Sequence, residues 1–372
     1  MALVALALCA TITGVLSNKL RAVATVIVSI FLFLAVADEL IYCFDSTDNN
    51  RFHRTYANSY LTFLDDIGKA PNPGRHRSRN ETRSGDLIYD VIYTIGDDHF
   101  RVTPKGERPV GTEASIRINF FGCSFTFGEG VNDDETFPYY VQQQIEGSVA
   151  KNFGFHGYGL HQTLAILKSN RDTGGQINVL LTSPFHAERA YCLSPFNLGS
   201  PRYVISAEGR VELAGKCLGY GLSTINNSTA TGIFVNHLLI MLHESPLYQK
   251  ASMAYFRMPH ENDKQFELYV ALIKEIAAVS AQRGQKLVIA FLKAWRADFT
   301  GSYSNEKLLR EIENMHLDVV DVTLADSAEA VPKRFYLHDV DWHPTPPAHK
   351  ARASIVAGEI RKVLSNASFS SD

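Results

Sequence analysis

A serine at the end of an apolar stretch has the setting of a nucleophile. Ser124 lies in the run Gly122-Cys123-Ser124-Phe125-Thr126, directly after an apolar and aromatic stretch that begins at Ile116. The stretch predicts a buried strand, and the glycine turn after it puts the serine at the carboxyl end of that strand, where open α/β sheets assemble their sites. A serine hydroxyl is a weak nucleophile, so the chain must also supply a base, a group that orients the base, and donors for an oxyanion.

A histidine near the C-terminus has the surroundings of a general base. His343 stands two residues after Asp341 and directly before the run Pro344-Thr345-Pro346-Pro347, which predicts the start of a helix. An aspartate can accept the proton-bearing ring nitrogen of such a histidine and leave the other nitrogen facing the serine. We therefore predict Ser124 as nucleophile, His343 as base and Asp341 as orienting acid, with Asp339 as the second choice for the acid.

Each feature has a structural explanation when it stands alone: a tight turn for the serine, a surface or capping role for the histidine. Together with a glycine-rich run between them, Asn152-Phe153-Gly154-Phe155-His156-Gly157-Tyr158-Gly159, they resemble the motifs of the SGNH (GDSL-like) hydrolase superfamily. The resemblance covers about residues 116 to 364, and the run from Gly128 to Pro138 matches a pattern common in bacterial members. Cys123 occupies the place of the family's usual aspartate, a departure that spares the nucleophile.

The resemblance also implies the oxyanion donors. They are the backbone N–H groups of Ser124 and Gly157 and a side chain that follows the third strand, normally an asparagine. Here the stretch 177–182 is followed by Ser183-Pro184-Phe185-His186-Ala187-Glu188-Arg189, and we align His186 with that asparagine because an imidazole N–H can also donate. Arg189 either binds an anionic substrate or pairs with a structural acid, and the sequence leaves both open.

Alternating strand and helix patterns predict the fold. The expected strands cover 116–121, 149–152, 177–182, 286–292 and 317–322, and the expected helices cover 136–145, 160–167, 263–282, 305–313 and a last one ending near 364. This order predicts an α/β three-layer sandwich with a mainly parallel sheet over residues 111–372. An insertion at about 184–255 is expected to hold a surface hairpin (203–206 with 210–213) and an apolar helix (231–243) and to shape the substrate pocket.

Residues 45–110 are expected to form a polar linker and a β-hairpin. The stretch to about residue 85 is rich in Asn, Arg, Asp and Pro, which is typical of a tether, and its Asn80-Glu81-Thr82 matches a glycosylation acceptor. The stretches 87–94 and 100–103 alternate around a Gly96-Asp97-Asp98 turn and predict the hairpin.

The N-terminal residues 1–44 predict a membrane anchor of one or two transmembrane helices. Two apolar runs, 2–16 and 22–37, flank a short turn that holds Lys19 and Arg21, and acidic residues follow the second run. This arrangement favours a cytoplasmic turn and an extracytoplasmic body. A signal peptide and a pair of buried core helices are the alternatives; the first run lacks the charged start of a signal peptide.

Composition narrows the classes of partner. The chain has 372 residues, 45% hydrophobic and 20% charged, with a net charge of -3 and no basic run, which argues against nucleic acid. The five cysteines form no CxxC pair, so we expect no metal, and no motif calls for a cofactor. Cys192 and Cys217 are the one pair that a disulfide could join, a question that the sequence leaves open.

These observations lead to one hypothesis and two alternatives. The hypothesis is a membrane-anchored, extracytoplasmic SGNH-type serine esterase that works through an acyl-enzyme, with an O-acetyl group on a surface glycan as the suggested substrate. An O-acyltransferase would use the same residues with an acceptor hydroxyl in place of water. A degenerate, noncatalytic glycan-binding or assembly module is the other alternative, for which Cys123 and His186 are the arguments.

Overall fold

The computed structural model describes residues 53–56, 60–82, 84–105, 116–194, 197–217, 259–294, 304–325 and 330–368, together with residues 26, 29, 33 and 36. The two apolar N-terminal runs and the predicted helix over 231–243 therefore lie almost wholly outside the described residues, and the membrane anchor stays a prediction. Within the described part of the chain, no helix is both long and apolar enough to span a bilayer.

A five-stranded parallel sheet forms the centre of the described fold, in the order β12-β11-β8-β6-β7. The pairing of Phe121 with Leu180 aligns the carboxyl ends of β6 and β8, so the loops that follow these two strands leave the sheet side by side. The parallel sheet predicted from the sequence is confirmed. Its strands are β6 (Ile116–Phe121), β7 (Ser148–Asn152), β8 (Ile177–Thr182), β11 (Lys286–Phe291) and β12 (Asp318–Asp321).

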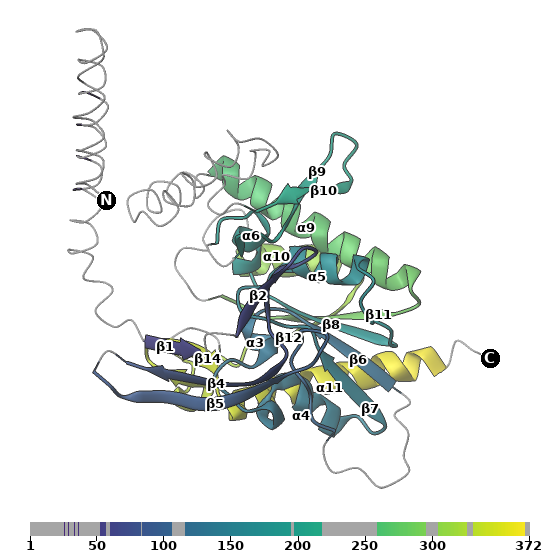
Figure 1. Cartoon of the computed structure of the whole chain (residues 1–372). Coiled ribbons are helices and arrows are strands. Elements are labelled where there is room, and N and C mark those ends of the chain that lie inside the picture. The colour runs from purple at the N-terminus through teal and green to yellow at the C-terminus, as the bar shows by residue number, and fades with distance from the viewer. Residues whose placement is uncertain are drawn as a thin grey trace.

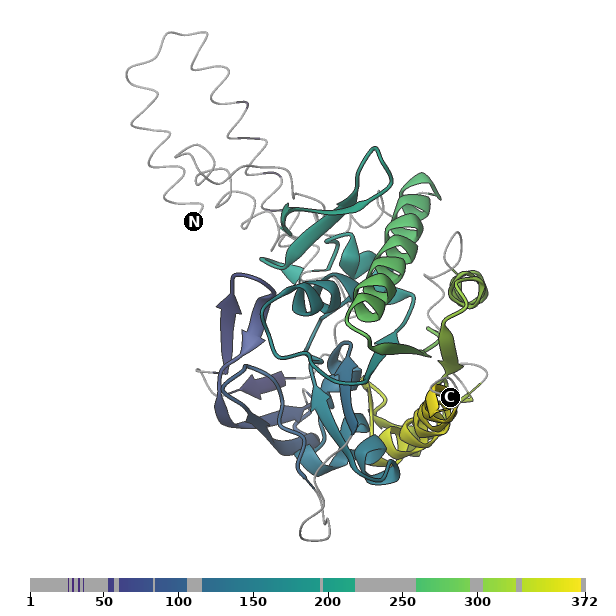
Figure 2. The same cartoon turned by 90° about the vertical axis from the view of Figure 1, so that its right-hand side faces the viewer.

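Helices cover both faces of this sheet, as Figures 1 and 2 show. One face packs against α4 (Phe137–Gln144) and α11 (Pro346–Ser368), and the other against α5 (Leu160–Lys168), α9 (Pro259–Gln282) and α10 (Asn305–Asn314). The predicted α/β three-layer arrangement is thus present in the described residues. The helix boundaries lie within a few residues of those expected from the apolar pattern.

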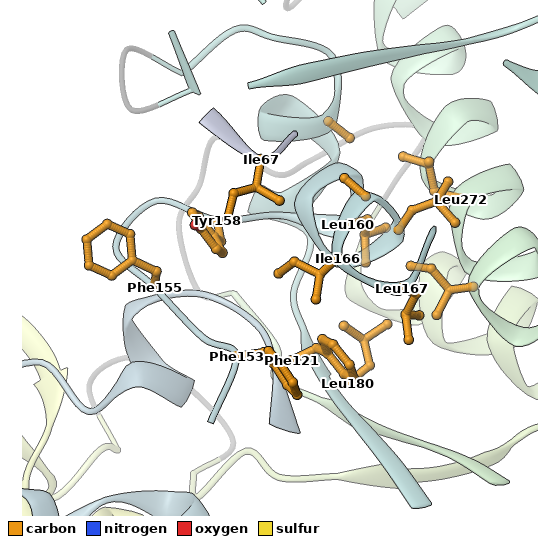
Figure 3. Packing of buried hydrophobic residues seen from close by; sticks show 14 of the residues in the cluster. Ile67, Phe121, Phe153, Phe155, Tyr158, Leu160, Ile166, Leu167, Leu180 and Leu272 are labelled. Atoms are coloured by element: carbon orange, nitrogen blue, oxygen red, sulfur yellow. The ribbon is translucent and has the colours of Figure 1, made fainter. Parts of the chain in front are cut away.

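Strand β8 packs against the helices on both faces of the sheet. All six of its residues are buried; Val179 and Leu181 pack toward α4 and α11, whereas Leu180 packs toward α5 and α9. Successive side chains of a strand point to opposite faces, so a strand covered on both sides is apolar over most of its length. The two polar residues of β8, Asn178 and Thr182, are hydrogen-bonded inside the fold. Figure 3 shows Leu180 and Phe121 beside Leu167 of α5 on the second face.

The N-terminal arm differs from the sequence prediction. Residues 61–81 were expected within a polar tether but form the hairpin β2 (Leu61–Leu64) and β3 (Gly68–Pro71) and the strand β4 (Gly74–Glu81). The partners of β4 are β1 (His53–Tyr56) and β5 (Leu87–Ile95), both antiparallel. The expected partner of β5, residues 100–103, forms only isolated bridges through Arg101. The buried side chains of β4 are polar, which is why no apolar alternation marked it as a strand.

Shorter elements complete the fold around the carboxyl edge of the sheet. The predicted surface hairpin is present as β9 (Pro201–Ile205) and β10 (Val211–Lys216), and a disulfide joins Cys192 to Cys217 beside it. The segment that carries His343 was expected as a loop and is a short strand, β14 (Asp341–Pro344), paired with β13 (Tyr336–His338). Further short helices are α3 (Ser124–Phe127), α6 (Phe185–Ala190), and the 3-10 turns η2 (Asp133–Glu135) and η5 (Lys333–Phe335).

Candidate active site

Ser124, His343 and Asp341 lie in contact at the carboxyl edge of the sheet. The hydroxyl oxygen of Ser124 is 2.9 Å from Nε2 of His343, and Nδ1 of His343 is 2.5 Å from Oδ1 of Asp341. The same Asp341 oxygen accepts the backbone N–H of His343 at 3.2 Å. A nucleophile, a base and a group that orients the base are therefore joined with the geometry that nucleophilic catalysis needs.

The turn before the nucleophile requires glycine. Gly122 has a φ of +148°, and a side chain there would bring a Cβ atom within 2.9 Å of the carbonyl oxygen of Leu181. Gly154, in the second glycine-rich run, approaches the serine helix as closely, because a Cβ on it would lie 2.7 Å from the backbone nitrogen of Phe127. Both glycines thus allow backbone segments to pack around Ser124 where larger residues would not fit.

Asn152 ties the second glycine-rich run to the serine helix. Its side-chain amide donates to the carbonyl oxygens of Thr126 and Phe127 at 3.1 and 3.3 Å, and its Oδ1 accepts the N–H of Gly154 at 3.0 Å. The asparagine of this motif therefore positions the backbone.

A buried arginine that the sequence analysis missed holds the loop after the nucleophile. The Arg101 side chain is 0% exposed and packs against the rings of Tyr93 and Phe127, with 4.5 and 4.9 Å from its guanidinium carbon to the ring centroids. Its donors satisfy one carboxylate and three carbonyl oxygens of the loop. These acceptors are Asp133 (2.8 Å), Phe127 (2.9 Å), Gly128 (2.6 Å) and Val131 (2.8 Å).

Asn80 of the N-terminal arm completes the surroundings of the orienting acid. Its side-chain amide donates to Oδ2 of Asp341 at 2.9 Å, while Oδ1 of Asp341 serves His343, and both Asn80 and Asp341 are buried. The Asn80-Glu81-Thr82 match to a glycosylation acceptor thus falls on an amide that is used inside the fold. The second choice for the acid, Asp339, is exposed and binds Lys333 and the hydroxyl of Tyr336, so it does not orient His343.

Replacing Asn80 by alanine should lower kcat/KM for an ester substrate about ten- to a hundredfold. A hydrogen bond to a charged group contributes about 1.5–3 kcal/mol, and Asp341 would lose one while it stays buried. The control is Asn72→Ala in the same arm, whose amide bonds the carbonyl of Leu61 away from the site and should leave the rate nearly unchanged. Equal rates for both variants would show that Asn80 does not position Asp341.

Gly157, the predicted backbone oxyanion donor, has a φ of +78° and forms a hydrogen bond with a residue of the predicted insertion. Its carbonyl oxygen accepts the side-chain amide of Asn197 at 3.1 Å. The same amide lies 3.2 Å from Nε2 of His161, whose pKa burial lowers to about 3, so the neutral ring can accept the second amide proton. No sequence motif pointed to Asn197, which lies between the two half-cystines.

His186, the predicted side-chain donor, lies in the first turn of α6 and is fully buried. Its Nδ1 is 3.3 Å from the Thr182 hydroxyl, which is 2.9 Å from the hydroxyl of Tyr269. No hydrogen-bond partner for its Nε2 is found among the described residues. Burial, aided by the nearby positive charge of Arg189, lowers the pKa of His186 well below its usual value, so the ring is neutral at neutral pH.

Arg189 has a structural partner. Its Nη1 donates to the carbonyl oxygen of Tyr158 at 2.9 Å, and its guanidinium lies 4.6 Å from the ring centre of Phe185. Within the described part of the chain no ion pair joins it to a carboxylate, so the predicted pairing with a structural acid is not found there. A substrate role for Arg189 stays a proposal. Over the same residues, no cluster of three or more His, Cys, Asp or Glu side chains is arranged to hold a metal ion.

Comparison with known proteins finds similarity at the level of the fold. No protein-family model and no curated protein matches the sequence. Several solved structures that resemble the chain are GDSL/SGNH hydrolases. One is a lipolytic protein of the G-D-S-L family from Veillonella parvula, with 11% identity and a TM-score of 0.36 over 66% of this chain and 97% of that one.

Two others are acetyl esterases. A mutant acetyl-xylooligosaccharide esterase from Geobacillus is 11% identical with a TM-score of 0.37, over 67% of this chain and 95% of that one. An acetyl xylan esterase from Butyrivibrio proteoclasticus is 10% identical with a TM-score of 0.35, over 70% of this chain and 66% of that one. These likenesses concern the fold, and the function proposed next rests on the side-chain geometry described above.

Proposed function

We propose that the protein is a serine esterase that works through an acyl-enzyme. The observation that carries the proposal is the unbroken contact from the Ser124 hydroxyl through the His343 ring to the Asp341 carboxylate. An arrangement of this kind activates a hydroxyl, because the ring can take the serine proton while the carboxylate stabilises the charge that forms on the ring. A noncatalytic module would have no need to keep these three groups within hydrogen-bond distance.

In the first half of the reaction, Ser124 Oγ forms a bond to the ester carbonyl carbon as its proton passes to Nε2 of His343. The imidazolium then gives this proton to the leaving alcohol oxygen as the carbon–oxygen bond breaks, and the acyl group stays on Ser124. In the second half, a water molecule gives a proton to Nε2 while its oxygen bonds to the acyl carbon. Ser124 takes the proton back as the acid leaves.

The hydrogen bonds around His186 support its role as the side-chain oxyanion donor. Burial raises the pKa of Tyr269, so its phenol stays protonated and can donate to the Thr182 oxygen. The Thr182 hydroxyl can then donate to Nδ1 of His186, which places the ring proton on Nε2. A buried N–H for which the described residues offer no acceptor is a group that a developing oxyanion would satisfy, together with the N–H groups of Ser124 and Gly157.

His186→Ala should lower kcat about a hundredfold to a thousandfold with little change in KM, because an oxyanion donor acts chiefly in the transition state. His186→Asn, which restores the donor usual in the family that the sequence resembles, should keep more of the rate than alanine does. Steady-state kinetics of both variants, with matched unfolding curves to verify the fold, make the measurement. A His186→Ala rate equal to that of the wild type would remove His186 from the oxyanion site.

The cellular setting proposed for the enzyme is an extracytoplasmic catalytic domain tethered to the membrane by its N-terminus. The apolar N-terminal runs support the lipid bilayer as a partner, and the Cys192–Cys217 disulfide supports an oxidising compartment. An ester substrate in the form of an O-acetyl group on a surface glycan fits this setting. Arg189 is proposed to contact an anionic part of such a glycan, and nucleic acid is not a proposed partner.

The experiment that tests the function is hydrolysis of p-nitrophenyl acetate, butyrate and octanoate by the full chain, with mass spectrometry of the protein during turnover. We expect hydrolysis, strongest for the chain length that the site accepts, and an acyl adduct on the peptide that contains Ser124. Turnover that appears only when a glycan hydroxyl is added would favour the acyltransferase. A folded sample with neither turnover nor adduct would contradict the proposal and favour the noncatalytic module.

A further inference from the structure

A second carboxylate lies beside the catalytic histidine. Oε2 of Glu129 is 3.4 Å from Nε2 of His343, the same nitrogen that lies 2.9 Å from the Ser124 hydroxyl. The Glu129 side chain is 2% exposed. Removal of a carboxylate from water costs several kcal/mol, so a carboxylate at this place needs compensating contacts or a use for its charge.

The backbone fixes Glu129 relative to the nucleophile. Its N–H donates to the carbonyl oxygen of Ser124 at 3.0 Å, so the two residues belong to one turn. Arg101 binds the carbonyl oxygens of Gly128 and Val131 on either side of Glu129. The backbone of Glu129 is therefore fixed beside the nucleophile by this turn.

The side chain of Glu129 is anchored on its other side by His156 and Tyr60. Nδ1 of His156 is 2.7 Å from Oε2 of Glu129, and Nε2 of His156 is 2.8 Å from the Tyr60 hydroxyl. Burial, and next the phenol of Tyr93 and the carboxylate of Glu129, raise the pKa of Tyr60, so its hydroxyl keeps its proton and can donate to Nε2. With Tyr60 as the donor, the ring proton of His156 lies on Nδ1 and is donated to the carboxylate of Glu129.

We propose that Glu129 is a second acidic residue of the catalytic site, which faces the proton-accepting nitrogen of His343 and stabilises the imidazolium from the side opposite Asp341. The inference deepens the esterase function proposed above and rests on it. A carboxylate within about 4–6 Å of an imidazole favours the charged form of the ring, and His343 becomes charged in both halves of the reaction.

The distance explains why Glu129 does not compete for the proton. At 3.4 Å it is beyond the usual range of a hydrogen bond, whereas Ser124 at 2.9 Å is within it. The contact with His156 holds the carboxylate at this separation. Nε2–H therefore stays directed at the oxygen atoms that react, and Glu129 acts through its charge.

Besides Glu129, an aspartate, a phenylalanine and a second histidine interact with His343. Asp341 lies at Nδ1, the ring of Phe125 is 5.4 Å away between ring centres, and His349 of α11 interacts with His343 electrostatically. Burial lowers the pKa of His349 well below its usual value, so this ring is neutral. The carboxylate of Asp341 thus lies at Nδ1 of the catalytic ring and that of Glu129 at Nε2, with His156 on the far side of Glu129.

The test is the titration of His343 in the full chain in detergent, followed by NMR of labelled histidines in a Ser124→Ala background that needs no turnover. The His343 signal is assigned by its loss in His343→Gln. Glu129→Gln should lower the midpoint of the His343 titration by at least about one pH unit, because the ring loses a neighbouring negative charge. Asp134→Asn, which removes an exposed carboxylate from the same loop, should leave the midpoint unchanged.

Kinetics with Ser124 in place provide the second reading. In Glu129→Gln the acid limb of kcat/KM should move to lower pH by the same amount, and the plateau should fall about tenfold. Glu129→Asp, which keeps the charge at a shorter reach, should lie between the wild type and Glu129→Gln in both measurements. If Glu129→Gln does not fold, Glu129→Asp is measured in its place. The His343 titration midpoint of Glu129→Asp must then lie below that of the wild type.

The outcomes separate this inference from the esterase proposal. An unmoved His343 midpoint in Glu129→Gln overturns the inference whether or not the wild type hydrolyses esters. A lowered midpoint in a protein without turnover supports the electrostatic pairing and contradicts the esterase. A purely structural role for Glu129 predicts a lower plateau with the acid limb in place, which would also overturn the inference.

Discussion

Ser124→Ala is expected to lower kcat for ester hydrolysis by at least about a thousandfold, to the level set by the remaining oxyanion donors and substrate binding. The reason is that no other hydroxyl or thiol of the described residues is shown in contact with Nε2 of His343, which Ser124 approaches to 2.9 Å. His343→Ala should cost a similar factor. The double variant should be no slower than either single one, because the two side chains act as one unit. Initial rates on the best p-nitrophenyl ester make the measurement.

Cys123 provides the matched control for this loss. It is the neighbour of the nucleophile, buried and outside the disulfide, and it stands where the related motif has aspartate. Its side chain makes no capping hydrogen bond to α3, so Cys123→Ala should keep kcat within about a factor of ten of the wild type. Loss of activity in Cys123→Ala with retention in Ser124→Ala would move the nucleophile from the hydroxyl to the thiol and contradict the mechanism proposed here.

The strands and helices of the central layers could be predicted from the sequence because each depends on the pattern of residues within its own segment. A strand covered on both faces is apolar over most of its length, as β8 is apart from Asn178 and Thr182, and α4 is capped by Thr136, whose side chain accepts the N–H of Tyr139. The serine turn and the His343 segment could be recognised because nucleophilic catalysis needs a serine, a histidine and an acid, and these motifs contain them. Their contact across 219 positions of sequence follows once both are placed at the carboxyl edge of one sheet.

The contribution of the N-terminal arm could not be predicted in the same way. Strand β4 turns His76, Ser78 and Asn80 inward, so its pattern of apolar and polar residues resembles that of a linker. The use of these side chains is visible only in three dimensions, since Asn80 meets its partner Asp341 across 261 positions. Buried polar groups need partners, and a single sequence does not show which distant residue provides one.

The roles of Arg101 and Glu129 were missed for a related reason. In the sequence, Arg101 is one cation near a turn, and Glu129 is one acid between two glycines of a motif that drew attention to its serine. Only the fold shows that the arginine packs against two rings and that the carboxylate faces the catalytic histidine. Residue type suggests surface positions for both, because charged residues are seldom buried unless they are paired.

Arg101→Met is expected to be the most destabilising of the substitutions considered, by about 3–5 kcal/mol in the free energy of unfolding. Methionine fills part of the space beside the rings, but it leaves the Asp133 carboxylate and the three loop carbonyl oxygens without the donors of Arg101. Because these carbonyls belong to the turn that holds Ser124 and Glu129, kcat should fall as well, even at temperatures where the variant is folded.

The control for this substitution is Arg117→Met, which removes an arginine whose side chain is 46% exposed and whose partner is Asp172 at 3.0 Å. A pair of this kind contributes at most about 1 kcal/mol, so urea unfolding should separate the two variants by several kcal/mol. If both variants unfold at the same urea concentration, the turn around the nucleophile does not depend on Arg101. The N-terminal arm would then act on the active site through Asn80 and Tyr60, because Asn80 binds Asp341 directly and Tyr60 holds the His156–Glu129 pair beside His343.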